Sequence, residues 1–279
     1  MNNKVLKSSK VENVNWSKVE NVNWSKVENV NWSKVENVNW LKMENYSGRN
    51  VIAFSKGELK WNGVELRLSN MCTSPIKLGD LEFQSAEAAY IACGFDGRIP
   101  QATEIQHKIA SMNNGMMVKR KYRFKKEYEW LETNGMHQSI WRLELMLWLN
   151  WQKCLKDRDF RNRLLSIPDS YVIVENQNRI LRDKGRWGCK NKEAQLECDR
   201  IMKELESVAD EVGLSKKEIE NRAELGSWKK GTWVGRNYQG KILMECRRAL
   251  REGTLPRINI DDLNKADIYI LGKKVKFEL

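Results

Sequence analysis

The pattern of hydrophobic and polar positions predicts a mainly helical domain with a few short strands. Apolar runs predict buried strands at 51–54 and 171–175. Residues 59–61 and 64–66 flank Asn62-Gly63, a dipeptide that favours the tight turn of a β-hairpin. Strong helices that alternate with few strands are typical of an α+β fold, here predominantly helical with a small β-sheet. The predicted helices are 85–94, 103–112, 139–155, 157–167 and 241–251.

Local signals support several of these elements. Ser85 is a suitable N-cap for the first helix, and Pro168 ends the helix 157–167. The helix 139–155 is apolar nearly all round, so we expect it to lie in the core.

Turn residues outside the helices predict a loop and a hairpin. Pro75 and Gly79 indicate a loop. The segments 266–271 and 274–279 lie on either side of Gly272, and we expect them to form a closing hairpin.

The N-terminal part of the chain is a tandem repeat. Residues 9–40 are four copies of Ser-Lys-Val-Glu-Asn-Val-Asn-Trp, and a degenerate fifth copy begins at Leu41. A period of eight fits neither repeat that makes helices supercoil, and the unit is shorter than those of solenoid proteins. We therefore expect 1–47 to be a disordered tail and 48–279 to be a single domain. The alternative is a multivalent array that offers its tryptophans to a partner.

A charged stretch, residues 190–230, interrupts the domain. Ile201, Leu205, Val208 and Val212 recur there at helical spacing, which predicts a helical hairpin or an extended helix pair beside the active site. A lid, a nucleic-acid clamp and an oligomer contact all remain open as its role, and the sequence does not define an oligomeric state.

The formal net charge of +12 suggests an anionic partner, although a basic surface also serves solubility alone. The most basic segment, 119–126, holds six basic residues with two aromatic residues between them. It suits a nucleic-acid backbone or a diphosphate. The alternative is a solvated connection before a helix.

Residue types and hydropathy argue against a metal site and a membrane span. The chain has six scattered cysteines and two histidines, without the spacing of a zinc site. No metal or cofactor is therefore expected, and reduced thiols fit the cytoplasm. We find no apolar run of the roughly 18–20 residues that cross a bilayer, and the polar N-terminus differs from a signal peptide. A viral or mobile-element origin would suit the duplicated tail.

Three motifs carry candidate chemistry. The first joins Leu68-Ser69-Asn70 to 83–90, Phe-Gln-Ser-Ala-Glu-Ala-Ala-Tyr. The second is 183–188, Asp-Lys-Gly-Arg-Trp-Gly, which follows a predicted strand. The third is 235–247, Gly-Arg-Asn-Tyr-Gln-Gly-Lys-Ile-Leu-Met-Glu-Cys-Arg. Together they supply carboxylates, aromatic faces, amides and free backbone N–H groups, which are the parts that hold a sugar and a flat base.

These motifs, in this order, resemble the signature of the NADAR (YbiA-like) family over roughly residues 50–255, apart from the insertion 190–230. The resemblance implies an N-glycosidase, which hydrolyses the bond between ribose C1 and a base nitrogen. Family activities act on ADP-ribosylated guanine in nucleic acid or on ribosylated intermediates of the riboflavin pathway. The resemblance also implies a NADAR/YbiA-like α+β fold.

The resemblance implies roles for individual residues. Glu87 and Asp183 are the candidate catalytic carboxylates, because cleavage builds a cation at C1 and needs an activated water. By position alone, Glu87 would also be stabilised by the dipole of its helix without any catalytic role. The candidate substrate-binding residues are Asn70 and Asn237 for hydrogen bonds, Trp187 with Trp130 or Trp141 for stacking, Tyr90 and Gly188 within the motifs, and Gly235 with Gly240 for close approach of a phosphate.

One departure from the family leaves the substrate open. Gly94 stands where the family usually has a lysine, so that role would pass to 119–126 or the substrate would differ. Three functions remain: removal of ADP-ribose from guanine in nucleic acid, hydrolysis of ribosylaminopyrimidine phosphates, and non-catalytic binding of ADP-ribose or nucleic acid. The net charge favours the first, and the presence of both Glu87 and Asp183 argues against the third.

Overall fold

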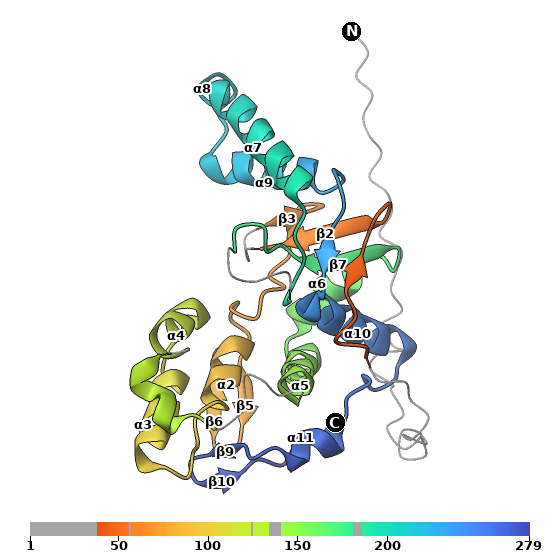
Figure 1. Ribbon diagram of the computed structural model, residues 1–279. Coiled ribbons are helices and arrows are strands. Elements are labelled where there is room, and N and C mark those ends of the chain that lie inside the picture. Colours follow the sequence, from red (N-terminus) through yellow and green to blue (C-terminus); the bar gives the residue numbers. More distant parts are fainter. Residues whose placement is uncertain (1–37, 56, 58, 124, 134–140, 181–185) are drawn as a thin grey trace.

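The computed structural model describes residues 38–55, 57, 59–123, 125–133, 141–180 and 186–279 (Figure 1). Its helices are α2 (Ala86–Ala92), α3 (Pro100–Ala110), α4 (Gly115–Tyr122), the 3-10 helix η3 (Lys126–Leu131), α5 (Trp141–Lys156), α6 (Arg158–Ser166), α7 (Lys192–Ser207), α8 (Ala209–Val212), α9 (Lys216–Ser227), α10 (Tyr238–Glu252) and α11 (Ile260–Lys265). Its strands are β1 (Glu44–Asn45), β2 (Asn50–Phe54), β3 (Lys60–Trp61), β4 (Val64–Glu65), β5 (Ile76–Leu78), β6 (Leu81–Phe83), β7 (Tyr171–Glu175), β8 (Val234–Gly235), β9 (Tyr269–Ile270) and β10 (Lys273–Lys274).

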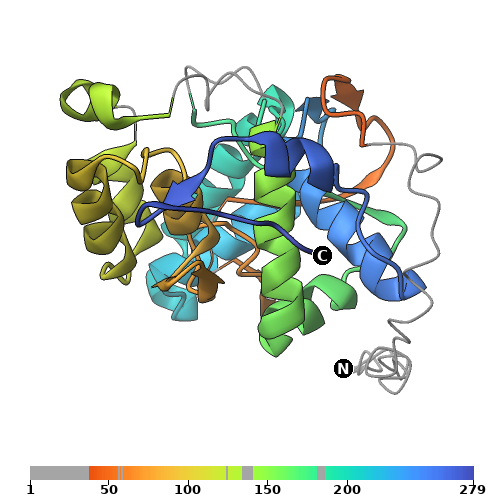
Figure 2. The same cartoon turned by 90° about the horizontal axis from the view of Figure 1, so that it is seen from below.

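Helix α5 is the centre of the core. It packs against α2 on one side and α10 on the other, and Figure 2 shows it between these two helices. Its apolar residues are buried nearly all round, as its sequence predicts. The helix also carries a buried carboxylate, Glu144, and a buried amide, Asn150, which need partners from other elements.

The strands form five separate two-stranded pairs rather than the one small sheet that was predicted. The longest pair is β2 with β7, which run parallel from Asn50↔Tyr171 to Phe54↔Glu175. Both predicted strands are confirmed, and α10 covers β7. A parallel pair requires a long connection between its strands, and here that connection contains α2 to α6.

Two predicted hairpins are confirmed. Between β3 and β4, Asn62 (φ 50°) and Gly63 (φ 79°) both have the positive φ of a type I′ turn. Between β9 and β10, Leu271 (φ 50°) and Gly272 (φ 78°) form a similar turn, although the strands are shorter than predicted.

Regular structure occurs in two segments where the sequence indicates a loop or leaves a connection open. Pro75 and Gly79 do not mark a simple loop, because β5 and β6 pair as a third hairpin with Gly79 in its turn. The basic segment 119–126 is not a connection throughout. Its first four residues complete α4, which begins after an Asn114 side-chain cap.

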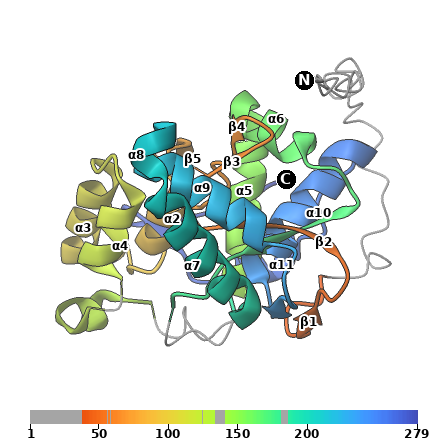
Figure 3. The same ribbon diagram turned by 90° about the horizontal axis from the view of Figure 1, so that it is seen from above.

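Helices α7 to α9 form the predicted helical hairpin, which projects from one end of the molecule (Figures 1 and 3). Helix α9 starts with a capping box between Ser215 and Glu218. The facing surfaces bury small residues such as Ala194 and Ala223. Val208 and Val212, which the helical spacing placed on the apolar face, are exposed.

The domain begins before the predicted boundary at residue 48. Trp40, the last residue of the fourth repeat, is buried, and β1 pairs with β8. The first three repeats and most of the fourth, within 1–37, lie outside the described residues, so the predicted disorder there stays a prediction.

Candidate active site

The centre of the candidate site is Glu87, in the first turn of α2. Ser85 caps this helix by accepting a hydrogen bond from Ala88 N (3.2 Å). The Glu87 carboxylate is buried, and its Oε1 accepts a hydrogen bond from Arg123 Nη1 at 2.9 Å. Lys119 Nζ lies 3.8 Å from the same oxygen. The basic segment therefore directs two cations at the candidate catalytic carboxylate, which compensates for its burial.

Two aromatic rings lie beside Glu87. Tyr90 follows it by one helical turn and packs edge-on against Trp187, with 6.2 Å between ring centroids. Trp187 also meets Tyr238 edge-on at 5.8 Å. The Arg123 guanidinium lies 5.8 Å from the Tyr90 ring centroid. The first motif thus meets the second and third in space.

The Tyr90 hydroxyl remains a neutral hydrogen-bond donor. Burial raises its pKa to about 12, although Arg123 and Arg142 act in the opposite direction. The hydroxyl oxygen is buried and has no hydrogen-bond partner among the described residues. Because a buried hydroxyl without a partner is unfavourable, Tyr90 suits contact with a polar group of a substrate.

The N-terminus of α10 holds the loop of residues 186–188, which carries Trp187. Backbone N–H groups of Asn237, Tyr238 and Gln239 donate to the carbonyl oxygens of Gly188 (3.1 Å), Arg186 (3.1 Å) and Trp187 (2.8 Å). These amides are already satisfied within the chain, and the expected approach of a phosphate at Gly235 and Gly240 stays a prediction. The effect of the three bonds is to position Trp187.

Asn237 closes the free edge of β7. Its Nδ2 donates to the Ile173 carbonyl (2.8 Å), and its Oδ1 accepts from the Glu175 amide (3.4 Å). The side-chain amide thus replaces part of a neighbouring strand. Asn237 is fully buried and has a φ of 51°. This geometry gives it a structural role, and its predicted hydrogen bond to base or sugar stays a prediction.

The motif glycines permit close packing on the strands. A Cβ on Gly188 would lie 1.8 Å from the Glu175 carbonyl oxygen, and one on Gly240 would lie 2.2 Å from the Ile173 carbonyl oxygen. Gly235 is buried in β8, where it pairs with Glu44 of β1. The close approaches seen at Gly188 and Gly240 are between segments of the chain itself.

Asn70 positions Glu87. Its carbonyl oxygen accepts a hydrogen bond from the Glu87 amide (3.0 Å). Neighbouring amides hold its side chain, because Nδ2 donates to Gln239 (2.6 Å) and Oδ1 accepts from Gln239 (2.9 Å) and Asn150 (3.1 Å). These bonds use one of the two N–H groups of Nδ2, and the predicted contact with base or sugar stays a prediction.

A cavity of about 300 Å³ lies next to these residues. Helix α4, the end of β7 and the α7–α9 hairpin all line it. Lys119 is the residue it shares with the candidate site, whereas Glu87, Tyr90 and Trp187 do not line it. The place of the inserted hairpin beside the active site stays a prediction. The walls of the cavity include Met71, Lys119, Glu175, Gln195, Cys198 and Glu224.

The remaining predicted residues lie elsewhere or outside the described residues. Trp130 and Trp141 both line a different cavity, of about 610 Å³, and neither lines the cavity at Lys119. Trp130 is 62% exposed. Asp183 lies outside the described residues.

Sequence reasoning missed the partners of Glu87. Lys119 and Arg123 belong to a segment interpreted as a site for a phosphate or a nucleic acid, and neither the charge nor the spacing of that segment points to one carboxylate. Gln239, inside the third motif, was not singled out. Within the described residues, no group of three or more His, Cys, Asp or Glu side chains is arranged to hold a metal ion, and no helix is long and apolar enough to cross a membrane.

The chain is similar to a solved structure but matches no family model and no curated protein. Among solved structures, the chain is similar to the NMR structure of the E. coli protein YbiA, with 16% identity and a TM-score of 0.42 over 73% of this chain and 86% of that one. The resemblance to the NADAR family therefore rests on the three motifs and on where the fold places them.

Proposed function

We propose that this chain is an N-glycosidase that hydrolyses the bond between ribose C1 and a base nitrogen, with ADP-ribosylated guanine in nucleic acid as its substrate. The observation that supports this function most is the contact of Tyr90, one turn after Glu87, with Trp187. Motifs about a hundred residues apart in sequence thereby join a carboxylate, two cations and an aromatic pair in one site.

The carboxylate suits the chemistry of N-glycoside cleavage. As the bond breaks, positive charge develops at C1, and a fixed carboxylate stabilises that charge most strongly where water is excluded. Glu87 is buried and held by Arg123 and by the helix cap at Ser85. We assign Glu87 to the cation or to the attacking water, and Asp183 to the ribose hydroxyls or the same cation.

The surroundings of Glu87 suit the other parts of the substrate. Trp187, which is partly exposed and is held by the buried Tyr90, provides the aromatic surface on which a leaving base stacks. Lys119 lines the cavity and offers its charge to a phosphate. The net charge of +12 favours a polyanionic substrate.

A second candidate function is hydrolysis of small ribosylated pyrimidine phosphates. The cavity volume of about 300 Å³ favours it, because that volume is at the lower end of the range for small-molecule sites. The two candidates differ in their response to salt. Binding of nucleic acid weakens steeply as salt rises, whereas binding of one small anion weakens little.

The test is release of ADP-ribose from an oligonucleotide that carries ADP-ribosylated guanine. We expect release by the wild-type protein and a fall of about 100-fold or more for Glu87→Gln, which keeps the shape but removes the charge. Glu82→Gln is the matched control, since it makes the same change at an exposed carboxylate, and it should release ADP-ribose normally.

Each other outcome has a definite reading. No release by the wild-type protein, with turnover of a ribosylaminopyrimidine phosphate, would replace the substrate and keep the reaction. Undiminished release by Glu87→Gln would remove Glu87 from the mechanism. Tight binding of ADP-ribose without hydrolysis of either substrate would identify the chain as a binding module.

A further inference from the structure

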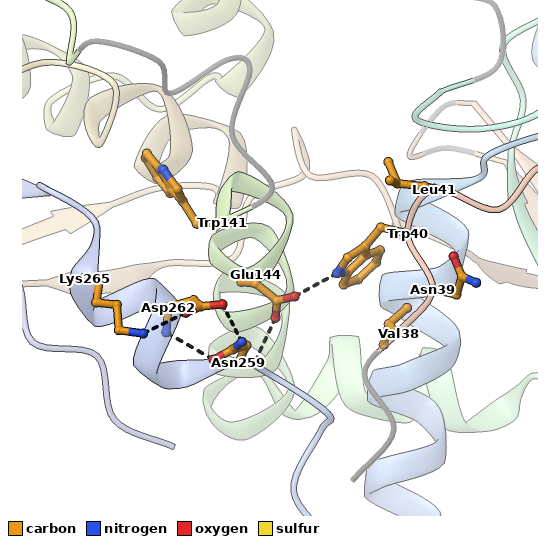
Figure 4. A pocket seen from close by; sticks show the side chains of 9 residues that line it. All are labelled: Val38, Asn39, Trp40, Leu41, Trp141, Glu144, Asn259, Asp262 and Lys265. Atoms are coloured by element: carbon orange, nitrogen blue, oxygen red, sulfur yellow. Dashed lines mark hydrogen bonds and ion pairs between the residues drawn. The ribbon is translucent and has the colours of Figure 1, made fainter. Parts of the chain in front are cut away.

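The last octapeptide repeat is docked on the domain through its tryptophan. The Trp40 side chain is buried, and its Nε1 donates a hydrogen bond to Glu144 Oε1 at 2.8 Å. The other oxygen of Glu144 accepts from the Asn259 amide at 3.0 Å. Figure 4 shows Glu144 between Trp40 and Asn259, with Trp141 across the cavity. The indole N–H thus satisfies a carboxylate that is buried in the core helix α5.

The residues after Trp40 are anchored as well. Lys241 Nζ donates to the carbonyl oxygens of Asn39 and Lys42, both at 2.9 Å, and lies 3.1 Å from Glu44 Oε1. Residues 44–45 then pair with β8. The docked segment is therefore 38–45, which spans the end of one repeat and the start of the next.

Three upstream segments carry the same docking residues. The docked segment reads Val-Asn-Trp-Leu-Lys-Met-Glu-Asn, whereas 14–21, 22–29 and 30–37 each read Val-Asn-Trp-Ser-Lys-Val-Glu-Asn. The two differences fall at Leu41 and Met43, which are 57% and 52% exposed. Trp40 and Glu44, whose side chains make the contacts with the domain described above, therefore have identical residues at the matching positions upstream. The backbone bonds depend little on side-chain identity.

We infer that the Trp40 position is a binding site for the repeat unit, and that the upstream segments of the same chain are its alternative occupants. When Trp40 leaves, Trp32 takes its place beside Glu144, with Trp24 and Trp16 as further substitutes. The indole lines an open cavity of about 530 Å³ that Glu144 also lines.

The geometry of the chain favours exchange within one molecule. In the shifted register, the link between the docked segment and β2 grows from residues 46–49 to residues 38–49. Each doubling of the length of a flexible loop lowers the probability that its two ends meet by only roughly threefold. A segment of the same chain is also present at a far higher effective concentration than a segment of another molecule.

Tyr46 makes the fourth copy the resident occupant. Its amide donates to the Trp233 carbonyl (3.0 Å), and its hydroxyl accepts from Asn237 Nδ2 (3.2 Å). The residue at the matching position after each upstream segment is valine. An upstream occupant therefore keeps the Trp and Glu contacts and the backbone bond to Trp233, and loses the contact of the Tyr46 hydroxyl with Asn237.

The test substitutes the tryptophans in the full-length chain. Trp40→Ala alone should lower the melting temperature by only a few degrees, because an upstream tryptophan docks. Trp40→Ala combined with Trp16→Ala, Trp24→Ala and Trp32→Ala should lower it by on the order of 10 °C. The control with Trp40 intact and the three upstream tryptophans changed to alanine should melt like the wild-type protein.

NMR of the indole N–H groups supplies a second measurement if the quadruple variant does not fold. With ¹⁵N-labelled tryptophan, Trp40→Ala should keep one indole signal shifted by the Glu144 carboxylate, and Trp40→Ala with Trp32→Ala should still keep one. An equal loss of melting temperature for Trp40→Ala with and without the upstream tryptophans would overturn the inference. A melting temperature of Trp40→Ala that falls as the protein is diluted would also overturn it, since the docked segment would then come from a second molecule.

Discussion

The side-chain amides of Asn70 and Gln239 hydrogen-bond each other in both directions, at 2.6 and 2.9 Å. Asn150 of α5 adds a third amide to the pair. These buried amides tie the segment before α2 to the start of α10 and to the central helix. The Asn70 carbonyl also accepts from the Glu87 amide, and the Gln239 amide also donates to the Trp187 carbonyl. The amide pair therefore fixes the two halves of the candidate site relative to each other.

Replacing Asn70 by alanine should lower the free energy of unfolding by about 2–3 kcal/mol, because the amide groups of Gln239 and Asn150 would lose buried partners. Urea denaturation of both proteins measures the difference. Asn113→Ala is the control, since Asn113 is exposed and its loss should change little. Equal stability of the two variants would mean that the amide cluster contributes nothing.

Arg123→Met should destabilise the fold by about 3 kcal/mol, because it leaves the buried Glu87 carboxylate without its 2.9 Å partner. Combining it with Glu87→Gln should restore part of the loss, since the unpaired charge is then absent. A double-mutant cycle from denaturation curves measures this coupling. Strict additivity of the two changes would show that the pair is not coupled in solution.

Gly188→Ala should destabilise the fold severely and displace Trp187, because the new Cβ would meet the Glu175 carbonyl oxygen at 1.8 Å. Gly226→Ala in α9 is the matched change. Its Cβ meets only the flexible end of Ile201, at 2.9 Å, and alanine favours a helix by about 0.5–1 kcal/mol. Thermal melts and tryptophan fluorescence compare the two variants. Normal melting of Gly188→Ala would contradict the packing described for the motif.

Lys153 should make stability rise with pH in the alkaline range. It is fully buried beside the Phe160 ring, and burial lowers its pKa from 10.5 to about 8. The unfolded chain therefore binds more protons than the folded chain between these values, so stability rises with pH across that window. Below about pH 8, the buried charge lowers the free energy of unfolding by its full amount. Above pH 10.5, the pKa of the lysine in the unfolded chain, this cost is absent.

Lys153→Met removes this effect. At pH 7 the variant should be more stable than the wild-type protein by about 3 kcal/mol, and the difference should vanish as the pH approaches 10.5. Urea denaturation of both proteins over this range measures the difference between their free energies of unfolding at each pH. Other groups titrate alike in the two proteins, so their contributions cancel in this difference. A difference that stays constant with pH would show that Lys153 does not titrate in this way.

Elements with strong local signals could be predicted from the sequence. Asn62-Gly63 adopts the positive φ angles that the dipeptide favours, and Ser85 caps α2. The apolar pattern of 139–155 identifies the core helix, because a helix that is buried on all sides carries apolar residues on all its faces. These signals act over a few residues and need no knowledge of the partner.

Features that depend on distant partners could not be predicted. Asn237 was interpreted as a substrate ligand because a polar residue in a glycine-rich motif suggests binding, yet its amide completes the edge of β7. That need arises only because β7 pairs with β2 on one side alone among the described strands. Likewise, nothing in the local sequence distinguishes the copy of the repeat that ends at Trp40 from the earlier copies, whereas Glu144 and Lys241 are parts of the folded domain.

The docking of the copy next to the domain has a consequence for the gene. Duplication or loss of a whole eight-codon unit upstream leaves residues 38–45 and all their contacts unchanged, because a neighbouring unit supplies the same residues. Replication slippage in this tract is therefore neutral for the fold as long as the reading frame and one intact unit remain. Related strains should differ in the number of repeats far more readily than in the residues that follow Trp40.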